Sequence, residues 1–593
     1  MNQAEIISGL PGHLQSYVEV QDYDAYSPRD HALWRFLMGR LVHQLSDTAH
    51  GVYREGLEKV GIEMETIPNL EVMNAQLKPI GWQVLGVSGF IPPAIFMEFQ
   101  SRCILPIALR MRTIEQIFYT PAPDILHESA GHAPFLIDVD YSEFLQQFGK
   151  LGMKALSSEE DEALYQAVRR ISDVKAEGMT GEDAVQQLEA AIADVKKQQP
   201  SEAAKLARLH WWTIEYGLVG TVDDYKLFGA GLLSSLGESA SCLDDAKVNK
   251  RLLTVNAINH DYDITHEQPQ LFVTHSCRHM RQVLDEMARG MCQFSGGADA
   301  VRQAITCRTV CTVQYASGIQ ISGVVSEVLS DAMDNPIYVR TLGPTQLAWL
   351  GDQLPGHGVD YHSSGFGSPV GKVNEMARCL SEYSIDELGA YGIGVGDEFA
   401  QPVTLEFVSG VLVKGRLIGI ERRDQKNVLF SFVDCSVHDS EGVVLFDPDW
   451  GQYDMAVGHE LVSVFGGAAD RSSFSEWHSV QGNEYPTKIR LPDQAAGSGN
   501  DAAIRQDLYQ ASKVVREAIG NNAAHGNAEF ESAVEEALVA EDWLLLLEVC
   551  EAAMLLQLDS VPRVERELFR LLGSDHDLKL LVHEVIATFS LDQ

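Results

Sequence analysis

The chain has 593 residues and a formal net charge of −39, from 45 Lys and Arg against 84 Asp and Glu. This length predicts several domains, and the negative charge disfavours binding to nucleic acids and to anionic membranes. No apolar run is long enough to span a bilayer, and the first residues lack the basic and apolar segments of a secretory signal. We therefore expect a cytoplasmic protein whose nine scattered cysteines are free thiols.

Helical patterns dominate the first hundred residues. Ser27-Pro-Arg-Asp30 is placed to cap a helix with apolar residues at helical spacing, namely Trp34, Leu37, Leu41 and Leu45. Further helices are expected over roughly 49–60 and from residue 67. Residues 83–96 predict a short strand and a loop that enters a helix. None of these elements indicates chemistry by itself.

Two histidines lie close together in the stretch 119–132. His127 and His132 are five residues apart, with Glu128 and Gly131 between them, and Asp124 is placed to cap the short helix that begins there. The zinc hydrolase motif His-Glu-x-x-His needs a spacing of four, so it is excluded. Five residues correspond to ~140° around an α-helix. Both histidines can bind one metal only if the helix loosens near Gly131; otherwise they are buried histidines with local hydrogen bonds.

A candidate carboxylate lies downstream in the apolar, aromatic helical pattern 209–218. Glu215 is the one acid in this pattern, beside Trp211, Trp212 and Tyr216. A carboxylate in such surroundings is costly to bury without a partner, and a cation would be a natural one. Two histidines and a carboxylate form the facial triad of non-haem Fe(II) oxygenases. The alternative is an acid on a half-exposed helix face.

The ordered motifs resemble those of the pterin-dependent aromatic amino acid hydroxylases. The resemblance is to the phenylalanine 4-monooxygenase type, in a long bacterial form with a C-terminal extension, and it covers roughly residues 23–280. It implies a multidomain chain with a mainly α catalytic domain. The matching pieces are Arg112, Thr120-Pro-x-Pro-Asp-x-x-His-Glu-x-x-Gly-His132, Trp212-Thr-Ile-Glu-Tyr-Gly217, Phe228-Gly-Ala-Gly-Leu-Leu-Ser-Ser-x-Gly-Glu238, Tyr262-Asp-Ile-Thr265 and Gln268-Pro269.

The resemblance implies a metal and a pterin cofactor. Fe(II) would be held by three side chains, those of His127, His132 and Glu215. Glu128 would be a catalytic residue that orients water near the pterin without binding the metal. The cofactor, tetrahydrobiopterin or a related tetrahydropterin, would be held by the loop at Gly89 and stacked on Phe96.

The resemblance also implies a pocket for an aromatic amino acid, which would react with O2. The Arg112 guanidinium would bind the substrate carboxylate, helped by Thr120 and with Ser234 nearby. Trp211 would form a wall for the substrate ring. Ile264 is apolar at a position that is acidic in tyrosine hydroxylases, so it offers no partner to a substrate phenol.

The remaining sequence predicts further domains. The catalytic domain is expected over 1–289, with a charged helical insertion at about 157–208 that lies at the surface away from the iron. Residues 290–490 predict a β-rich module, with a hairpin at 313–325 and strands at 403–407, 410–420, 428–437 and 442–446. Residues 492–501 read as a linker and 502–593 as helices. The apolar run from Trp543 predicts a small bundle or a homodimer contact.

The leading hypothesis is a monooxygenase that converts phenylalanine to tyrosine. A tryptophan hydroxylase, or an enzyme that attacks another ring position, is the alternative within the class. A non-catalytic amino acid sensor, whose C-terminal half transmits ligand binding, belongs to a different class and is disfavoured by the intact ligand set. The sequence indicates no activity for residues 290–593.

Overall fold

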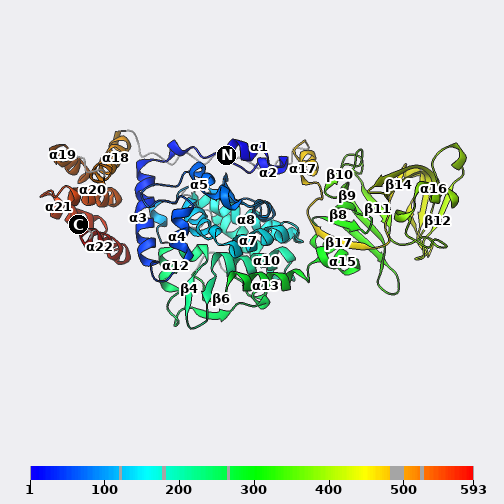
Figure 1. Cartoon of the computed structure of the whole chain (residues 1–593), viewed down its shortest axis with the longest axis horizontal. Coiled ribbons are helices and arrows are strands. Elements are labelled where there is room, and N and C mark those ends of the chain that lie inside the picture. The colour runs from blue at the N-terminus through cyan, green and yellow to red at the C-terminus, as the bar shows by residue number, and fades with distance from the viewer. Residues whose placement is uncertain are drawn as a thin grey trace.

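The computed structural model describes residues 2–87, 89–118, 123–176, 182–262, 267–480, 500–520 and 527–591. Figure 1 shows three regions in a row along the long axis, with a mainly helical region in the middle, a β region on one side and the C-terminal helices on the other. This confirms the predicted fold class. The predicted site residues Thr120 and Ile264, and most of the predicted linker, lie outside the described residues.

The middle region consists mainly of helices packed around a large apolar core, which continues into the C-terminal helices. Its two small sheets pair β1 with β2, and β4-β3-β6-β5 in that order. The strands are β1 (Gln83–Val87), β2 (Ile104–Ala108), β3 (Leu218–Gly220), β4 (Tyr225–Leu227), β5 (Asn249–Leu252) and β6 (Gln270–Thr274). The helices are α1 (Gln3–Ser8), α2 (Gly12–Gln15), α3 (Pro28–Gln44), α4 (Val52–Lys59), α5 (Leu70–Leu77), α6 (Pro93–Ser101), α7 (Val139–Gly152), α8 (Glu159–Ala176), α9 (Glu182–Lys196), α10 (Glu202–His210), α11 (Ala230–Leu233), α12 (Leu236–Ser241) and α13 (Cys277–Ala288).

Several local predictions for this region are confirmed. Ser27 caps α3 in a capping box with Asp30, which satisfies backbone donors at both residues. The strand, loop and helix expected over 83–96 are β1 and the start of α6. The predicted insertion forms the packed pair α8 and α9. It is not wholly remote from the expected pterin loop, because the Tyr165 hydroxyl of α8 donates to the carbonyl oxygen of Phe90 at 3.2 Å.

The β region contains two antiparallel sheets. The first has the order β10-β9-β8-β7-β17, with β11 also on β9; the second has the order β12-β13-β14-β15, with β16 also on β14. The first sheet comprises β7 (Val310–Tyr315), β8 (Ile319–Ser330), β9 (Pro336–Trp349), β10 (Asp352–Gln353), β11 (Gly365–Pro369) and β17 (Leu461–Gly466). The second comprises β12 (Val403–Glu406), β13 (Leu412–Arg423), β14 (Lys426–His438), β15 (Val444–Phe446) and β16 (Tyr453–Ala456). All the strands predicted from the sequence are present.

Three short helices border this β region. Side chains of α14 (Cys292–Ser295) and α15 (Gly297–Cys307) share an apolar core with β7 and β8, and both helices contact β17. The third is α16 (Ile385–Ala390). The helix α17 (Arg471–Val480) leads back to α2 of the middle region. This packing supports a domain boundary near residue 289, which remains a proposal.

The C-terminal helices pack on the far side of α3 (Figure 1). They are α18 (Asn500–Gly520), α19 (Asn527–Ala537), α20 (Trp543–Leu555), α21 (Val561–Leu571) and α22 (His576–Leu591). The apolar residues of α20 are buried within this bundle, and the rings of Trp543 and Phe36 meet edge to face at 5.5 Å. Glu548 pairs with Arg35 of α3. The bundle therefore accounts for the apolar run, and the homodimer contact remains a prediction.

Two further expectations concern the whole chain. All nine cysteines are free thiols, as predicted. Among the described residues, no helix combines the length and the apolar character needed to cross a membrane.

Candidate metal centre and active site

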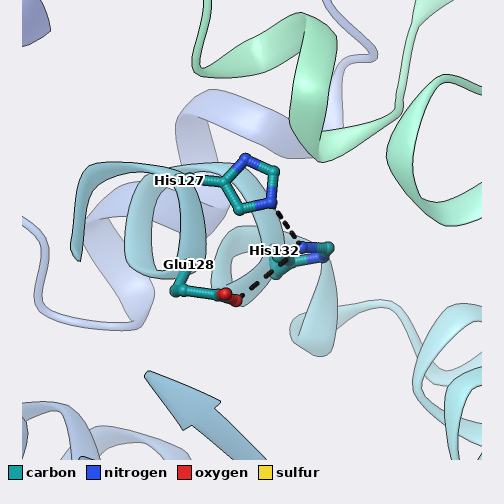
Figure 2. A group of neighbouring side chains, drawn as sticks. All are labelled: His127, Glu128 and His132. Carbon is teal, nitrogen blue, oxygen red and sulfur yellow. Dashed lines mark hydrogen bonds and ion pairs between the residues drawn. The ribbon is translucent and has the colours of Figure 1, made fainter. Parts of the chain in front are cut away.

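The two histidines of the predicted motif lie on one face of an irregular helix. The segment η4 (Leu126–His132) is a π-helix, in which hydrogen bonds close over five residues instead of four. A five-residue spacing therefore brings His127 and His132 together, and their Nε2 atoms are 3.3 Å apart. Figure 2 shows the two rings converging, with Glu128 alongside. The predicted loosening of the helix is confirmed.

Gly131 also permits a close contact that the sequence did not indicate. A Cβ at Gly131 would lie 2.9 Å from the Cβ of Ala230, so glycine here permits the close approach of α11. On the other side of α11, a Cβ at Gly229 would lie 2.3 Å from the carbonyl oxygen of Glu215. The Gly-rich turn at 228–231 thus packs against both segments that carry the candidate ligands, η4 and the segment that ends at Glu215. Its close contacts set the distance between them.

Glu215 lies between the two histidines. It ends a second π-helix, η6 (Trp211–Glu215), which continues α10. Its carboxylate oxygens lie 3.2 Å from Nε2 of His127 and 3.4 Å from Nε2 of His132. Three side chains that converge in this way have the composition of a metal site with two histidines and one carboxylate.

Glu128 joins the same cluster from the η4 side. Its Oε2 atom lies 3.9 Å from Nε2 of His132. His127, Glu128 and His132 offer ligand atoms that all lie within 4.8 Å of one another, so this group can hold a metal ion. Oε2 of Glu128 is buried without a hydrogen-bond partner among the described residues. The cluster therefore contains two carboxylates, of which Glu215 is nearer to both histidines.

Burial and mutual charge set the protonation of this cluster. Burial opposes protonation of His127, but the hydrogen bond and the negative charge of Glu215 raise its pKa to about 9. Burial would raise the pKa of Glu215, but the charges of His132 and His127 hold it well below its usual range. Burial raises the pKa of Glu128. Glu215 is thus the carboxylate that stays ionised most firmly, and a cation is its natural partner.

A second layer of hydrogen bonds orients His127. Its Nδ1 lies 2.9 Å from the Ser234 hydroxyl, which in turn donates to the carbonyl oxygen of Ala230 at 2.8 Å. The hydroxyl therefore accepts a hydrogen bond from the N–H at Nδ1, and this leaves Nε2 directed toward the cluster. The backbone N–H of His127 donates to Oδ1 of Asp124 at 3.0 Å, which confirms the predicted cap.

Arg112 is held by the same aspartate. Its Nε and one terminal nitrogen donate to the two oxygens of Asp124 at 2.7 and 3.0 Å, and the other terminal nitrogen donates to the carbonyl oxygen of Ser234 at 3.2 Å. The arginine is buried. The bidentate pair with Asp124 and the bond to Ser234 hold the guanidinium beside the residue whose hydroxyl orients His127.

Trp211 stands in an aromatic stack at the start of η6. Its ring lies 4.6 Å from the ring of Tyr216 and 4.4 Å from the ring of Tyr262, nearly parallel to the latter. The indole N–H donates to Oε1 of Gln268 at 3.3 Å. These contacts fix the plane of a large aromatic surface four residues before Glu215 in the sequence.

Gly89 and Phe96 are the residues expected to hold the pterin. Gly89 adopts a left-handed conformation, with φ at 63°, in the loop between β1 and α6. Phe96, in the first turns of α6, meets the His210 ring edge to face at 6.0 Å. Nδ1 of His210 is in turn 3.6 Å from Oε1 of Glu215. Phe96 is thus linked to the metal cluster through one imidazole.

Sequence reasoning assigned no role to His210. Burial lowers the pKa of His210 to about 4, so it presents a neutral imidazole to Glu215. Its Nε2 atom is buried without a hydrogen-bond partner among the described residues. A signal was available, because His210 and Glu215 have the same five-residue spacing as His127 and His132, and a π-helix brings each pair to one face.

The chain is similar to a family of known hydroxylases. The model of the biopterin-dependent aromatic amino acid hydroxylases matches residues 18–168 and 188–307. Phenylalanine-4-hydroxylase of Chromobacterium violaceum is 30% identical over 243 residues, which are 41% of this chain and 68% of that protein. Phenylalanine-4-hydroxylase of Pseudomonas aeruginosa is 30% identical over 262 residues, which are 44% of this chain and 84% of that protein.

The structure is also similar to a crystal structure of phenylalanine hydroxylase from Chromobacterium violaceum with bound iron(III) and 7,8-dihydrobiopterin. The match covers 48% of this chain and 90% of the chain in the crystal, at 26% identity and a TM-score of 0.38. The fold and the cluster of histidines and carboxylates define a mainly helical domain with a candidate metal site. More specifically, the chain belongs to the biopterin-dependent aromatic amino acid hydroxylase family. The match omits residues 169–187, in the α8–α9 pair, and ends at residue 307, in α15.

Proposed function

We propose that the chain is a monooxygenase that hydroxylates the ring of free phenylalanine to give tyrosine, with Fe(II), O2 and a reduced tetrahydropterin. The observation that carries this proposal is the convergence of Nε2 of His127, Nε2 of His132 and both oxygens of Glu215 within 3.4 Å. Two imidazoles and one carboxylate suit Fe(II) and leave coordination positions for other molecules. Bound Fe(II) and the reduced pterin would supply the electrons that activate O2.

The donor set fits the metal on chemical grounds. Glu215 is buried and ionised, and within the described part of the chain its ion-pair partners are three histidines and no lysine or arginine. A divalent ion would replace the proton that His127 holds, and so satisfy this carboxylate. We assign His127, His132 and Glu215 as the ligands. Glu128, farther away and with a raised pKa, is assigned to orient water beside the pterin.

The remaining site residues bind and position the other reactants. Arg112, fixed by Asp124, is assigned to the substrate carboxylate together with Thr120. Ser234 is assigned to the same end of the pocket, where its hydroxyl also orients His127. Gly89 and Phe96 are assigned to the pterin. The aromatic stack of Trp211 and the apolar Ile264 would exclude water from the substrate ring.

Product analysis tests this function. The full chain, loaded with Fe(II) and supplied with reduced tetrahydrobiopterin, should convert phenylalanine to tyrosine with one oxygen atom from ¹⁸O2, as read by mass spectrometry. The same reaction without pterin is the control. An iron-loaded chain that hydroxylates none of the three aromatic amino acids would contradict the proposal and favour an amino acid sensor.

Substrate choice follows from the pocket residues. We expect phenylalanine first, tryptophan slower and tyrosine least, because burying the tyrosine hydroxyl beside Ile264 without a partner costs about 1–3 kcal/mol. Apolar pockets separate apolar rings only by roughly 10–200-fold. Trp211→Phe should narrow the gap between phenylalanine and tryptophan in kcat/KM. A wild-type kcat/KM for tryptophan above that for phenylalanine would overturn the order.

A further inference from the structure

A second cluster of metal-ligating side chains lies in the β region, far along the chain from the proposed iron site. His357 and His362 stand in the loop between β10 and β11, and Asp454 stands in β16. Their ligand atoms all lie within 4.8 Å of one another. Nδ1 of His357 is 3.2 Å from Nε2 of His362 and 4.0 Å from Oδ2 of Asp454. We propose that these three side chains form a second metal site, for a divalent transition ion such as Zn²⁺.

The distances suit a shared ion. Ligands bound at about 2.0–2.2 Å from zinc in a tetrahedron lie roughly 3.2–3.6 Å from one another. The separation of the two imidazole nitrogens is within this range, and a small side-chain rotation would close the gap to Asp454. Imidazole and carboxylate donors are those that zinc, iron and other first-row ions accept. Three protein ligands would leave one position for water.

The carboxylate is oriented for this task. Oδ1 of Asp454 accepts hydrogen bonds from the Ser431 hydroxyl at 2.6 Å and from the Gln452 amide at 3.0 Å, and this leaves Oδ2 on the side of the histidines. The side chain of Asp454 is only 2% exposed, and its ion-pair partner in the described part of the chain is His357, with no lysine or arginine. A buried carboxylate in this position gains from a cation.

The histidines are held on a fixed stretch of backbone. The carbonyl oxygen of His357 accepts from the N–H of Leu347 at 2.9 Å, and that of His362 accepts from the N–H of Thr345 at 3.1 Å. The backbone of both histidines is therefore hydrogen-bonded to β9. The Tyr361 ring packs edge to face against both imidazoles, at 5.5 and 4.7 Å. A preformed site of this kind loses little freedom when the ion binds.

The position of the cluster indicates what the ion would do. The histidine loop is bonded to β9 of the first sheet, whereas β16 pairs with β14 of the second sheet. Figure 1 shows β11 and β14 at the junction of these sheets. An ion bound by all three residues would cross-link the two sheets. It would stabilise a region to which neither the sequence nor the comparisons assign an activity.

Metal content of the full chain tests this site. Chains stripped with a chelator, incubated with excess Zn²⁺ and desalted should contain one equivalent less zinc in His362→Ala and in Asp454→Asn than in the wild type. His459→Ala removes an exposed histidine from the same region and should leave the zinc content unchanged. Because only the difference is used, the result does not depend on whether the His127 site also takes zinc.

Further measurements show whether a loss of zinc comes from a lost ligand or from misfolding. Asp454→Asn keeps the size of the side chain, and circular dichroism should show a wild-type fold. Zinc should raise the Tm of the wild type and of His459→Ala by several degrees more than it raises the Tm of Asp454→Asn, in which the His127 site is intact. Co²⁺ should give visible absorption bands that Asp454→Asn weakens. Equal zinc content in the wild type and all three variants, or an equal loss of zinc in His459→Ala, would overturn the proposal. The two imidazoles would then only share a hydrogen bond.

Discussion

Two histidine pairs in this chain have the same five-residue spacing but stand on different kinds of backbone. His127 and His132 are brought together by a π-helix deep in the helical region, with their nitrogens 3.3 Å apart. His357 and His362 are brought together by a loop tied to β9, with their nitrogens 3.2 Å apart. The spacing alone therefore specifies no backbone conformation. Each pair meets because neighbouring elements fix the backbone that carries it.

The carboxylates mark the difference between the two clusters. Glu215 bridges both histidines of its pair, with oxygens at 3.2 and 3.4 Å, and a third imidazole stands at 3.6 Å. Asp454 approaches one histidine of its pair at 4.0 Å and is oriented by two neutral donors. The first arrangement suits an ion held by three side chains at a reaction centre, and the second suits an ion that joins two sheets.

The largest effect is expected from removing the carboxylate at the centre of the first cluster. Glu215→Ala removes one of three assigned ligands, so it should abolish stable iron binding and reduce kcat by more than about 10³-fold. Glu128→Ala should keep iron and lose part of the activity. Iron content and turnover, measured on both variants, separate the two carboxylates. Full iron occupancy in Glu215→Ala, with loss of iron in Glu128→Ala, would show that Glu128 is the metal ligand and Glu215 is not.

The next effect concerns the arginine behind the first cluster. Arg112→Lys keeps the charge but loses the planar fork that pairs with Asp124. It should raise the KM for the amino acid by about 10–100-fold and leave the KM for the pterin nearly unchanged. Steady-state kinetics with each reactant varied in turn measures both values. Equal increases in both would count against the assigned role.

A smaller effect is expected from the hydroxyl that orients His127. Ser234→Ala removes the acceptor for Nδ1, and losses of this kind weaken metal affinity by about 10–100-fold. Metal titration measures the change. Ser239→Ala is the matched control, because that hydroxyl bonds to the carbonyl of Ser235 and touches no ligand. Equal affinities in the two variants would show that the orientation of His127 comes from the backbone alone.

Much of the first cluster could be predicted from the sequence. The five-residue spacing, the lone Glu215 in an aromatic helix and the flanking motifs led to the same three residues. Binding of one metal by both histidines required the helix to loosen near Gly131, and the structure has a π-helix over Leu126–His132. The close contact of Gly131 with Ala230 was not predicted, because Ala230 is about a hundred residues away in the chain. Close contacts of this kind leave no local pattern.

The second cluster could not be predicted in the same way. His357 and His362 lie in a stretch rich in Gly, Ser and Pro that reads as a loop, and Asp454 follows about ninety residues later among many other acids. The strands themselves were predictable, because alternating apolar residues specify them locally. Which strands lie side by side was not, and it is the pairing of β16 with β14 that brings Asp454 to the loop. The His210 contact with Glu215 was missed although the two residues have the same five-residue spacing as His127 and His132.

The last prediction tests whether the two regions are joined by charge. Glu98 of α6 lies at the contact with α17. Its carboxylate faces His13 at 2.9 Å and Arg471 at 3.1 Å, and Arg102 at 3.0 Å. Burial would raise the pKa of Glu98, but the hydrogen bond from His13 and the charge of Arg471 lower it to about 2. A lowered pKa means that the folded chain favours the ionised form.

The sign of the pH effect follows from this shift. The contribution of Glu98 to the free energy of unfolding is fully present above the ordinary glutamate pKa and is lost as pH falls toward about 2. A shift of this size corresponds to on the order of 3 kcal/mol. Glu98→Gln should therefore be less stable than the wild type at pH 7, and the difference should shrink as pH falls below about 4.5. Urea unfolding at several pH values measures this difference in the free energy of unfolding.

The control is Glu143→Gln, at an exposed pair with Arg281, which should differ very little from the wild type in stability at any pH. A difference for Glu98→Gln that stays constant from pH 7 to pH 3 would mean that the contact is held by packing, and that the hydroxylase and β regions are not coupled by this charge.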